Sequence, residues 1–362
     1  MAHATANYRR EFYRHRDRRT THESKYFRRI KVACAPRLTP GASWPCADST
    51  CPAASVHSAF RTEFTRLGGH SARGGGAWRG WAAADWADAV AALLAKGAPA
   101  PDGPGAAILK PTGRTSEIWR LRMPDGRRVV LKRDRRASHR GPGRGLIVPT
   151  RATAAFRKGH ALLARGIATA RPAAAADLWR RGAVADSLLV TEAVDGEPLS
   201  DWLRRGPALA LRRRLARDLA QMLRRMHDAG FSHRDLKAPN ILVSPREGPG
   251  LPAGRQAGVR PVLVDLDGLR QAIRVSAWRR ARDLMRLSVS LDEWGVARRT
   301  DRLRFLRAYL GRRGCPGAIT TGGRRRGDRR AAGRLRRWWQ RIARMSERKA
   351  AALRRKKPAH GT

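Results

Sequence analysis

A polar stretch in the second half of the chain carries residues suited to phosphoryl transfer. Residues 233–236 read His-Arg-Asp-Leu and Asn240 follows, which gives the pattern H-R-D-L-x-x-x-N. Transfer of a phosphoryl group to an alcohol needs a carboxylate beside the attacking hydroxyl and oxygen ligands for Mg²⁺. Asp235 fits the first need, and the side-chain oxygen of Asn240 fits part of the second. Lys237 adds a cation that can face the transferring group, so we predict that Asp235 and Lys237 are catalytic. An acidic turn after a helix is the competing interpretation.

A second acid follows at the end of an apolar run. Residues 262–268 read Val-Leu-Val-Asp-Leu-Asp-Gly, which predicts a short buried strand that ends at Asp265. In kinases an aspartate at this place holds Mg²⁺. We therefore assign the metal to Asp265 and Asn240, with Asp267 as the rival of Asp265. An aspartate that only starts a turn is the structural alternative.

Two further residues are candidates for binding the nucleotide. The segment 129–132 reads Val-Val-Leu-Lys and returns from a turn at 124–126, so Lys132 ends a strand. A lysine at this place binds the phosphates of ATP in kinases, whereas a solvated lysine is the alternative. Glu192 lies in a strand predicted over 187–194, and the connector 193–196 offers backbone groups to an adenine edge. The predicted cofactors are ATP and Mg²⁺.

Two features of a kinase site are missing from the sequence. The loop 111–116 holds a single glycine, so the G-x-G-x-x-G pattern is absent. No Asp or Glu occurs between Asp134 and Asp177, so the helix predicted over 152–165 cannot supply an acid to Lys132. The sequence leaves open which residue replaces that acid.

The order of the segments predicts an α+β fold with a small β-rich N-lobe and a mainly helical C-lobe. We place the N-lobe at about 105–193 and the C-lobe at about 197–312, within a domain that spans 77–312. The apolar residues of 209–227 recur every three or four positions, which predicts a long amphipathic helix that delivers the catalytic loop. The Pro- and Gly-rich segment 244–260 is longer than a compact domain needs, so we interpret it as an insertion.

The composition is strongly basic. The chain of 362 residues has 77 Lys and Arg against 29 Asp and Glu, a formal net charge of +48. Such a charge attracts nucleic acid, anionic membranes or acidic substrates, but an Arg-, Ala- and Gly-rich composition can arise from coding bias alone, so the charge is weak evidence for any one partner. Given the catalytic motifs, nucleic acid is not expected as a partner. The four cysteines are expected to be free thiols in a reducing cytosol, with zinc binding by Cys34, Cys46 and Cys51 as the alternative.

The two ends differ from the middle of the chain. Residues 1–76 mix charges, Pro, Gly and Ser without periodicity and are predicted to be mostly disordered. The C-terminal tail, 313–362, contains sixteen Lys and Arg against two acids over 324–357, and apolar residues recur at helical spacing: Leu335, Trp338, Trp339, Ile342 and Met345. This pattern predicts a basic amphipathic helix, either lying on a membrane surface or simply solvated. No apolar run reaches the length of a membrane span, and the first residues are polar, so a cytoplasmic location is expected.

Taken together, these motifs and their flanking segments resemble the lipopolysaccharide kinases. These are bacterial sugar kinases that act on Kdo or heptose of the lipopolysaccharide core. The resemblance covers about residues 80–312, and its stretches are 114–120, 129–132, 156–163, 166–172, 232–240, 264–267 and 299–310. It implies a bilobal protein-kinase-like fold and transfer of a phosphoryl group from ATP to a sugar hydroxyl. It also implies a place at the inner face of the inner membrane, with a lipopolysaccharide core saccharide as partner.

Two other functions stay open on the sequence. A protein Ser/Thr kinase is supported by Lys237 in the pattern D-L-K-x-x-N, but no A-P-E segment follows Asp267. A non-catalytic basic protein that binds nucleic acid or membrane, with the kinase-like part as scaffold, is favoured by the charge. The intact acids at both metal positions argue against this second alternative.

Overall fold

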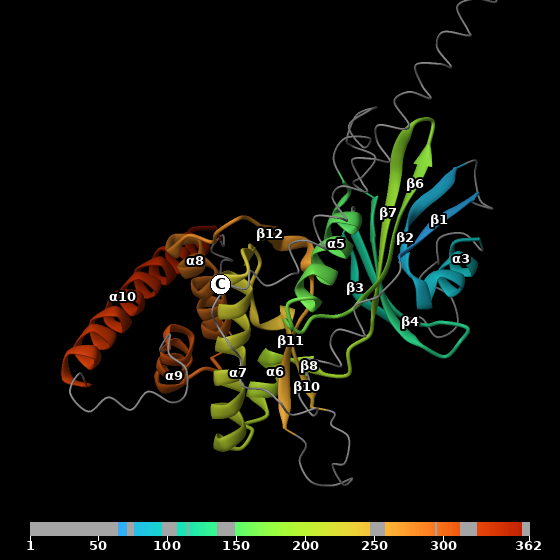
Figure 1. Cartoon of the computed structure of the whole chain (residues 1–362). Coiled ribbons are helices and arrows are strands. Elements are labelled where there is room, and N and C mark those ends of the chain that lie inside the picture. The colour runs from blue at the N-terminus through green and yellow to red at the C-terminus, as the bar shows by residue number, and fades with distance from the viewer. Residues whose placement is uncertain are drawn as a thin grey trace, which may run out of the picture. The chain divides into compact units, whose positions relative to one another are not determined.

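The computed structural model describes residues 64–70, 76–95, 107–113, 116–135, 149–246, 258–293, 295–311 and 324–356. Within these ranges the chain forms one sheet of seven strands, two smaller sheets and a series of helices (Figure 1). The N-terminal part is rich in strands and the C-terminal part is mainly helical, which confirms the predicted α+β class. None of the helices in the described ranges is at once long and apolar enough to span a bilayer.

The large sheet is antiparallel throughout, in the order β1-β2-β6-β7-β5-β4-β3. Its strands are β1 (Phe64–His70), β2 (Ala77–Ala83), β3 (Ala107–Gly113), β4 (Ser116–Arg122), β5 (Arg128–Asp134), β6 (Pro172–Arg180) and β7 (Ala183–Glu192). β5 lies beside β7, so Lys132 pairs with Leu189 in the middle of the sheet. This register fixes the backbone of Lys132 in a rigid element rather than a loop.

The two faces of this sheet are covered by different helices. α3 (Ala87–Ala95), which follows the short 3₁₀ helix η1 (Ala84–Trp86), covers one face with a core that includes Trp78 and Trp119. α5 (Arg151–Leu163) covers the other face through Phe156 (Figure 1). Along β7, Leu188 and Val190 face the first core and Leu189 faces the second, as the alternation of side chains in a strand requires.

The first two strands were not predicted. Phe64–His70 falls in the region expected to be disordered to residue 76, and that expectation is wrong for this segment. β2 and η1 also form over Ala77–Trp86, where the alanine-rich sequence favours a helix. Alanine-rich segments favour helices locally, but β2 instead pairs closely with β6, where a Cβ at Gly80 would meet the carbonyl oxygen of Ala175 at 2.0 Å. The tertiary pairing therefore overrides the local propensity.

The C-terminal part is built on one long helix. α7 (Leu209–Asp228) buries its apolar stripe in a core shared with α5 and with the helices that follow. The other elements are β8 (Glu197–Pro198), α6 (Leu199–Arg204), β9 (Phe231–His233), η3 (Ala238–Asn240), β10 (Ile241–Pro245), β11 (Val259–Leu263), η4 (Leu266–Gly268), β12 (Leu269–Gln271), α8 (Ala277–Glu293), α9 (Arg299–Leu310) and α10 (Arg324–Lys356). The strands pair as β11-β10-β8 and β12-β9. This pairing brings the segment after β9, which carries Asp235, close to the segment after β11, which carries Asp265 and Asp267.

The basic C-terminal helix, α10, packs its apolar side against the rest of the C-lobe. The apolar side chains Leu335, Trp338, Trp339 and Ile342 of α10 pack against the C-lobe core. α10 lies along α8 and also contacts α9 (Figure 1). The arginines of α10 whose side chains the structure describes are exposed, among them Arg337, Arg341 and Arg348, so this part of the helix presents charge, and not its tryptophans, to a binding partner. Residues 312–323 and 357–362 of the predicted tail, and 247–257 of the predicted insertion, lie outside the described residues.

Candidate active site

The buried ring of His233 connects the two segments that carry the acids. The backbone amide of Asp235 donates to Nδ1 of His233 at 3.2 Å, and Nε2 lies 3.0 Å from the carbonyl oxygen of Asp265. Because Nδ1 accepts a hydrogen bond, the ring hydrogen is on Nε2, which donates to the carbonyl oxygen of Asp265. Burial lowers the pKa of His233, in agreement with this neutral tautomer. One imidazole thus holds the loop of Asp235 against the segment of Asp265.

The residues predicted from the H-R-D-L-x-x-x-N pattern lie together. The Asp235 side chain is 54% exposed, and Nζ of Lys237 lies 2.9 Å from its Oδ2. Nδ2 of Asn240 donates to the carbonyl oxygen of Asp235 at 2.9 Å and approaches Oδ2 at 3.4 Å. With its amide nitrogen used in this way, Asn240 keeps its side-chain oxygen for a cation. The carboxylate of Asp235 is open to solvent, where an incoming hydroxyl can reach it.

The backbone of Asp265 adopts an uncommon conformation. Its φ is 58° and ψ is 69°, in the left-handed region. Among the described non-glycine residues, Arg181 is the other one with positive φ, and it lies with Gly182 in the tight turn between β6 and β7. Asp265 is in no hairpin turn. Such conformations cost about 1–3 kcal/mol and gather at functional sites, so the observation supports a working role for this residue.

Lys132 reaches both acids of the D-L-D segment. Its Nζ lies 2.8 Å from Oδ1 of Asp265 and 2.8 Å from Oδ2 of Asp267. Burial acts to lower the pKa of Lys132, but the charges of Asp267 and Asp265 outweigh it and the pKa is raised. For Asp265, burial acts to raise the pKa, and the charge of Lys132 brings it below its ordinary value. Both partners are therefore charged at neutral pH, as a phosphate-binding lysine and a metal-binding acid need to be.

The missing helix acid is replaced from within the D-L-D segment. α5 faces this segment with Lys158, whose Nζ donates to the carbonyl oxygen of Leu269 at 2.6 Å. Burial lowers the pKa of Lys158, and the charge of Asp267 partly opposes this. The helix thus contributes a cation, and Asp267 supplies the negative charge that Lys132 would otherwise lack.

Glu192 is fastened to the N-lobe by its side chain. Its Oε1 accepts hydrogen bonds from Nε1 of Trp86 at 3.1 Å and from Arg171 at 2.8 Å. Arg171 also binds the carboxylate of Asp85, so the carboxylate of Glu192 belongs to a network that ties the end of β7 to η1. Any contact of Glu192 with a nucleotide is therefore made by its backbone and not by its carboxylate.

Asp283 is a site residue that the sequence reasoning missed. It is 3% exposed, and its Oδ2 accepts from the backbone amide of His233 at 2.7 Å and lies 3.2 Å from Nε2 of His227. His227 in turn lies 2.7 Å from the hydroxyl of Tyr309, so α7, α8 and α9 all support the start of the catalytic loop. The sequence does contain a signal for this role, because Asp283 lies on the apolar face of the amphipathic helix α8. An acid buried on such a face needs hydrogen-bond or charge partners.

The hairpin that would cover the phosphates is irregular. β3 pairs with β4, and its register shifts between Ile108 and Lys110 and again between Lys110 and Gly113. Such bulges re-aim the strand next to a site. Arg114 and Thr115, at the tip of the hairpin in the loop with a single glycine, lie outside the described residues.

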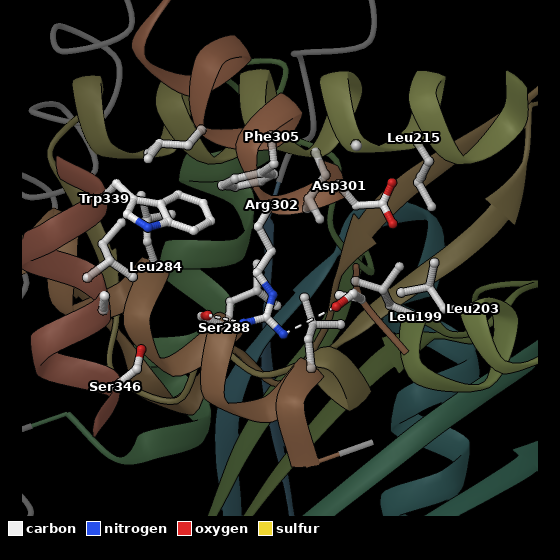
Figure 2. A pocket seen from close by; sticks show the side chains of 18 of the residues that line it. Leu199, Leu203, Leu215, Leu284, Ser288, Asp301, Arg302, Phe305, Trp339 and Ser346 are labelled. Carbon is white, nitrogen blue, oxygen red and sulfur yellow. Dashed lines mark hydrogen bonds between the residues drawn. The ribbon is translucent and has the colours of Figure 1, made fainter. Parts of the chain in front are cut away.

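An apolar cavity of about 310 Å³ lies elsewhere in the C-lobe (Figure 2). It is lined by residues of α6, α7, α8, α9 and α10, among them Leu215, Leu284, Phe305 and Trp339. Arg302 crosses it and approaches Ser288 at 3.5 Å (Figure 2). None of the predicted site residues lines this cavity, so it is not the place of the chemistry.

Comparison with known proteins identifies the family. The family model described as the lipopolysaccharide kinase (Kdo/WaaP) family matches residues 146–309. The lipopolysaccharide core heptose(I) kinase WaaP of Pseudomonas aeruginosa is 32% identical over 205 residues, which cover 52% of this chain and 71% of that protein. The chain belongs to the lipopolysaccharide kinase family. The resemblance recognised in the sequence is confirmed, and the protein is a kinase.

Other members of the lipopolysaccharide kinase family match a shorter stretch. The core heptose(I) kinase WaaP of Escherichia coli K12 is 31% identical over 113 residues, and the match spans 40% of that protein. A solved structure titled WaaP in complex with acyl carrier protein aligns with a TM-score of 0.45 and 24% identity, over 66% of this chain and 87% of that one. The family match at 146–309 includes Asp235, Asn240 and Asp265 and begins after Lys132.

Proposed function

We propose that the protein transfers the γ-phosphoryl group of ATP to a hydroxyl of a lipopolysaccharide core sugar, Kdo or heptose. The observation that carries the proposal is the joined arrangement of Lys132, Asp235 and Asp265, held together by the ring of His233. Membership in a family of kinases implies ATP as the donor. The core heptose kinases among the relatives favour a sugar as the acceptor.

In the proposed reaction, Asp235 orients the sugar hydroxyl and accepts its proton. The carboxylate is 54% exposed, and Lys237, with which it forms an ion pair, is itself 44% exposed. Lys237, 2.9 Å away, is close enough to stabilise the oxygens of the transferring phosphoryl group. Together they keep an acid–base group and a cation within reach of one transferred group.

The nucleotide phosphates are assigned to Lys132, whose charge is fixed by the two acids beside it. The donor set of Asp265 and Asn240, a carboxylate and an amide oxygen, fits the preference of Mg²⁺ for oxygen ligands. When bound there, Mg²⁺ would neutralise phosphate charge. The connector at Glu192 offers its backbone to the adenine edge.

The test is a transfer assay with labelled ATP and a panel of acceptors: core oligosaccharide, free sugars and proteins. Asp235→Ala is expected to lower the rate of phosphorylation by about 10² or more, because the general base is removed. Its side chain is exposed, so the variant should unfold at the same temperature. Asp88→Ala, an exposed acid on α3, is the matched control and should keep full activity.

Two results would overturn the proposal. Equal turnover by Asp235→Ala would remove this residue from the mechanism. Label on serine or threonine of added proteins, with none on core sugar, would favour a protein kinase. ATP consumption with Mg²⁺ that stops when the metal is removed supports the cofactor assignment.

We also propose that the protein works in the cytoplasm at the inner face of the inner membrane. The outward face of α10 supports this location, because its exposed arginines include Arg337, Arg341 and Arg348. Clusters of this kind are attracted to anionic lipids. The acceptor is then reached at the surface where the kinase is held.

A further inference from the structure

One stripe of α8 runs along the catalytic loop and continues past it. Asp283 receives the backbone amide of His233, and Oγ of Ser290 accepts the backbone amide of Ala238 at 3.0 Å. Arg286 lies between these two contacts on the same helix, so it borders the loop that carries Asp235. Four and eight residues earlier, at the spacing of one helix face, are Arg282 and Trp278.

Arg286 has two other arginines as charged neighbours, Arg282 and Arg234, and Arg234 directly precedes Asp235 in the chain. Arg286 is 21% exposed at its side chain, and its Nη1 lies 3.5 Å from Oδ1 of Asp283, a long contact. Burial, and then the neighbouring charge of Arg282, lowers the pKa of Arg286, with Arg234 acting in the same direction. Among the described residues, no carboxylate lies within ion-pair distance of Arg234 or Arg282. The cluster therefore carries more positive charge than its acids balance.

Such an arrangement is unfavourable without a ligand. Arg286 is partly withdrawn from water, so the positive charges of Arg282 and Arg234 near it repel it, and Asp283 already uses its other oxygen to hold His233. Coding bias can enrich arginine on a surface, but it does not by itself place one of them, partly buried, on the helix that holds the catalytic loop. An anion bound between them would offset the repulsion and accept their hydrogen bonds.

Trp278 adds an apolar platform at the end of the same stripe. It is 54% exposed, and the guanidinium carbon of Arg282 lies 5.1 Å from the centre of its ring. A large aromatic side chain that stays exposed on the helix that holds the catalytic loop is a candidate for ligand contact. The flat ring can pack against the apolar face of a sugar while Arg282 remains available to a charged substituent.

We propose that Arg234, Arg282, Arg286 and Trp278 form the acceptor subsite, and that it selects a sugar carrying an anionic group. The inference rests on the proposed function and specifies its substrate. The anion is a carboxylate or a phosphate ester, since a guanidinium binds both in the same way. The sugar ring lies against Trp278, and the anionic group lies between the arginines, which leaves a hydroxyl to face Asp235.

The experiment measures kcat and KM for an acidic sugar and its neutral partner. One pair is Kdo and carboxyl-reduced Kdo, and the other is a heptose phosphate and the free heptose. For Arg282→Gln and Arg286→Gln the preference for the acidic sugar should fall at least about tenfold, through KM for the acceptor, because a charge-assisted hydrogen bond is lost. KM for ATP and the unfolding temperature should not change. Trp278→Ala should raise KM for both sugars of a pair.

Arg213→Gln is the control for the loss of one arginine charge, since Arg213 is exposed, as Arg282 is, but lies near the start of α7. The two pairs separate the sources of the anion, because the loss will be confined to the carboxylate pair or to the phosphate pair. The proposal is wrong if Arg282→Gln and Arg286→Gln discriminate between acidic and neutral sugars as the unchanged protein does. Failure of the proposed function would look different, since no sugar would then be phosphorylated by any variant.

Discussion

At the scale of single residues, the charge around Lys132 determines how the site is assembled. Lys132 contacts two carboxylates from one short segment, Asp265 and Asp267, at 2.8 Å each. A lysine withdrawn from water needs this compensation, and here it comes from a turn and not from a helix. The two acids then have separable tasks. Asp265, in its left-handed conformation, is suited to a metal, whereas Asp267 holds the lysine.

A matched pair of substitutions tests this division. Asp267→Asn should raise KM for ATP about tenfold, because Lys132 loses one of its two partners and with it a fixed position. Asp267→Glu should restore part of the loss. Asp265→Asn should instead lower kcat at least about 10²-fold and raise the Mg²⁺ concentration needed for half-maximal rate.

The measurements are steady-state kinetics at varied ATP and at varied Mg²⁺, together with the shift in unfolding temperature on adding ATP. An Asp267→Asn protein that matches the unchanged one in all of these would mean that Asp265 alone positions Lys132. Reversal of the two phenotypes would give the metal to Asp267.

The motif residues could be predicted from the sequence because their spacing is local. The pattern around Asp235, and the strand ends at Lys132 and Asp265, depend on a few neighbouring positions. The roles of Asp267 and Asp283 depend on contacts between segments far apart in the chain. No spacing rule indicates that an acid two residues after Asp265 compensates a lysine 135 positions earlier. Such contacts are known only once the segments have packed.

At the scale of elements, α5 is pressed against the acidic segment. Its start is capped by Thr150, whose Oγ1 accepts the amide of Thr153 at 3.2 Å and donates to Asp177 of β6 at 2.8 Å. Further along, Gly159 allows close approach, because a Cβ there would lie 2.4 Å from Cγ of Pro172 and 2.8 Å from Cδ1 of Leu266. Leu266 follows Asp265 directly, so the position of α5 affects the position of Asp265 in the site.

Gly159→Ala tests how closely α5 packs against Pro172 and Leu266. In an open helix, alanine in place of glycine adds up to about 1 kcal/mol of stability. At this position the methyl group clashes, so the free energy of unfolding should fall by about 1–3 kcal/mol. KM for ATP should rise as Leu266 and its neighbours shift.

Gly333→Ala in α10 is the control for this substitution. A Cβ at Gly333 would meet only Nη1 of Arg337, at 3.6 Å, which is an ordinary contact. That variant should be slightly more stable than the unchanged protein in thermal or denaturant unfolding. If both alanine variants are stabilised alike, α5 is not held as closely as described.

The edge of the large sheet was the hardest element to predict. β1 and β2 contain glycine and alanine, Gly68, Gly69 and Gly80 among them, which disfavour strands in isolation. β2 nevertheless forms a strand because it pairs with β6, whose residues 173–176 are all alanine and leave room for close pairing. β1 then pairs with β2. The N-lobe begins before residue 77 for this reason. By contrast, α7 follows its sequence pattern almost residue for residue, from Leu209 to Asp228.

At the scale of the whole molecule, α10 separates charge from apolar surface. Its tryptophans pack inward, against α8 and α9, and its arginines with described side chains, among them Arg337, Arg341 and Arg348, are exposed. Both interpretations of the tail assumed a helix detached from the domain. A packed helix that exposes only charge would meet a membrane through electrostatics and would insert nothing.

Binding to lipid vesicles tests this view of α10. The full chain should bind vesicles that contain anionic phosphatidylglycerol and should be released at high salt, because the attraction is screened. The triple variant Arg337→Gln, Arg341→Gln, Arg348→Gln should bind at least about tenfold more weakly.

The control carries the same charge change on α7: Arg213→Gln, Arg217→Gln and Arg225→Gln, all exposed. Equal weakening by the two sets would mean that net charge alone, and not the face of α10, attracts the protein to the membrane. Binding that resists high salt would point instead to insertion of apolar side chains.

The backbone of Asp265 has a consequence for anyone who tries to make this kinase more heat-resistant. Design methods that relieve unfavourable torsions would select this position early, and glycine would satisfy them. The resulting enzyme should tolerate heat better and turn over substrate hardly at all. Selection for thermal stability and selection for catalytic activity therefore favour different residues at position 265.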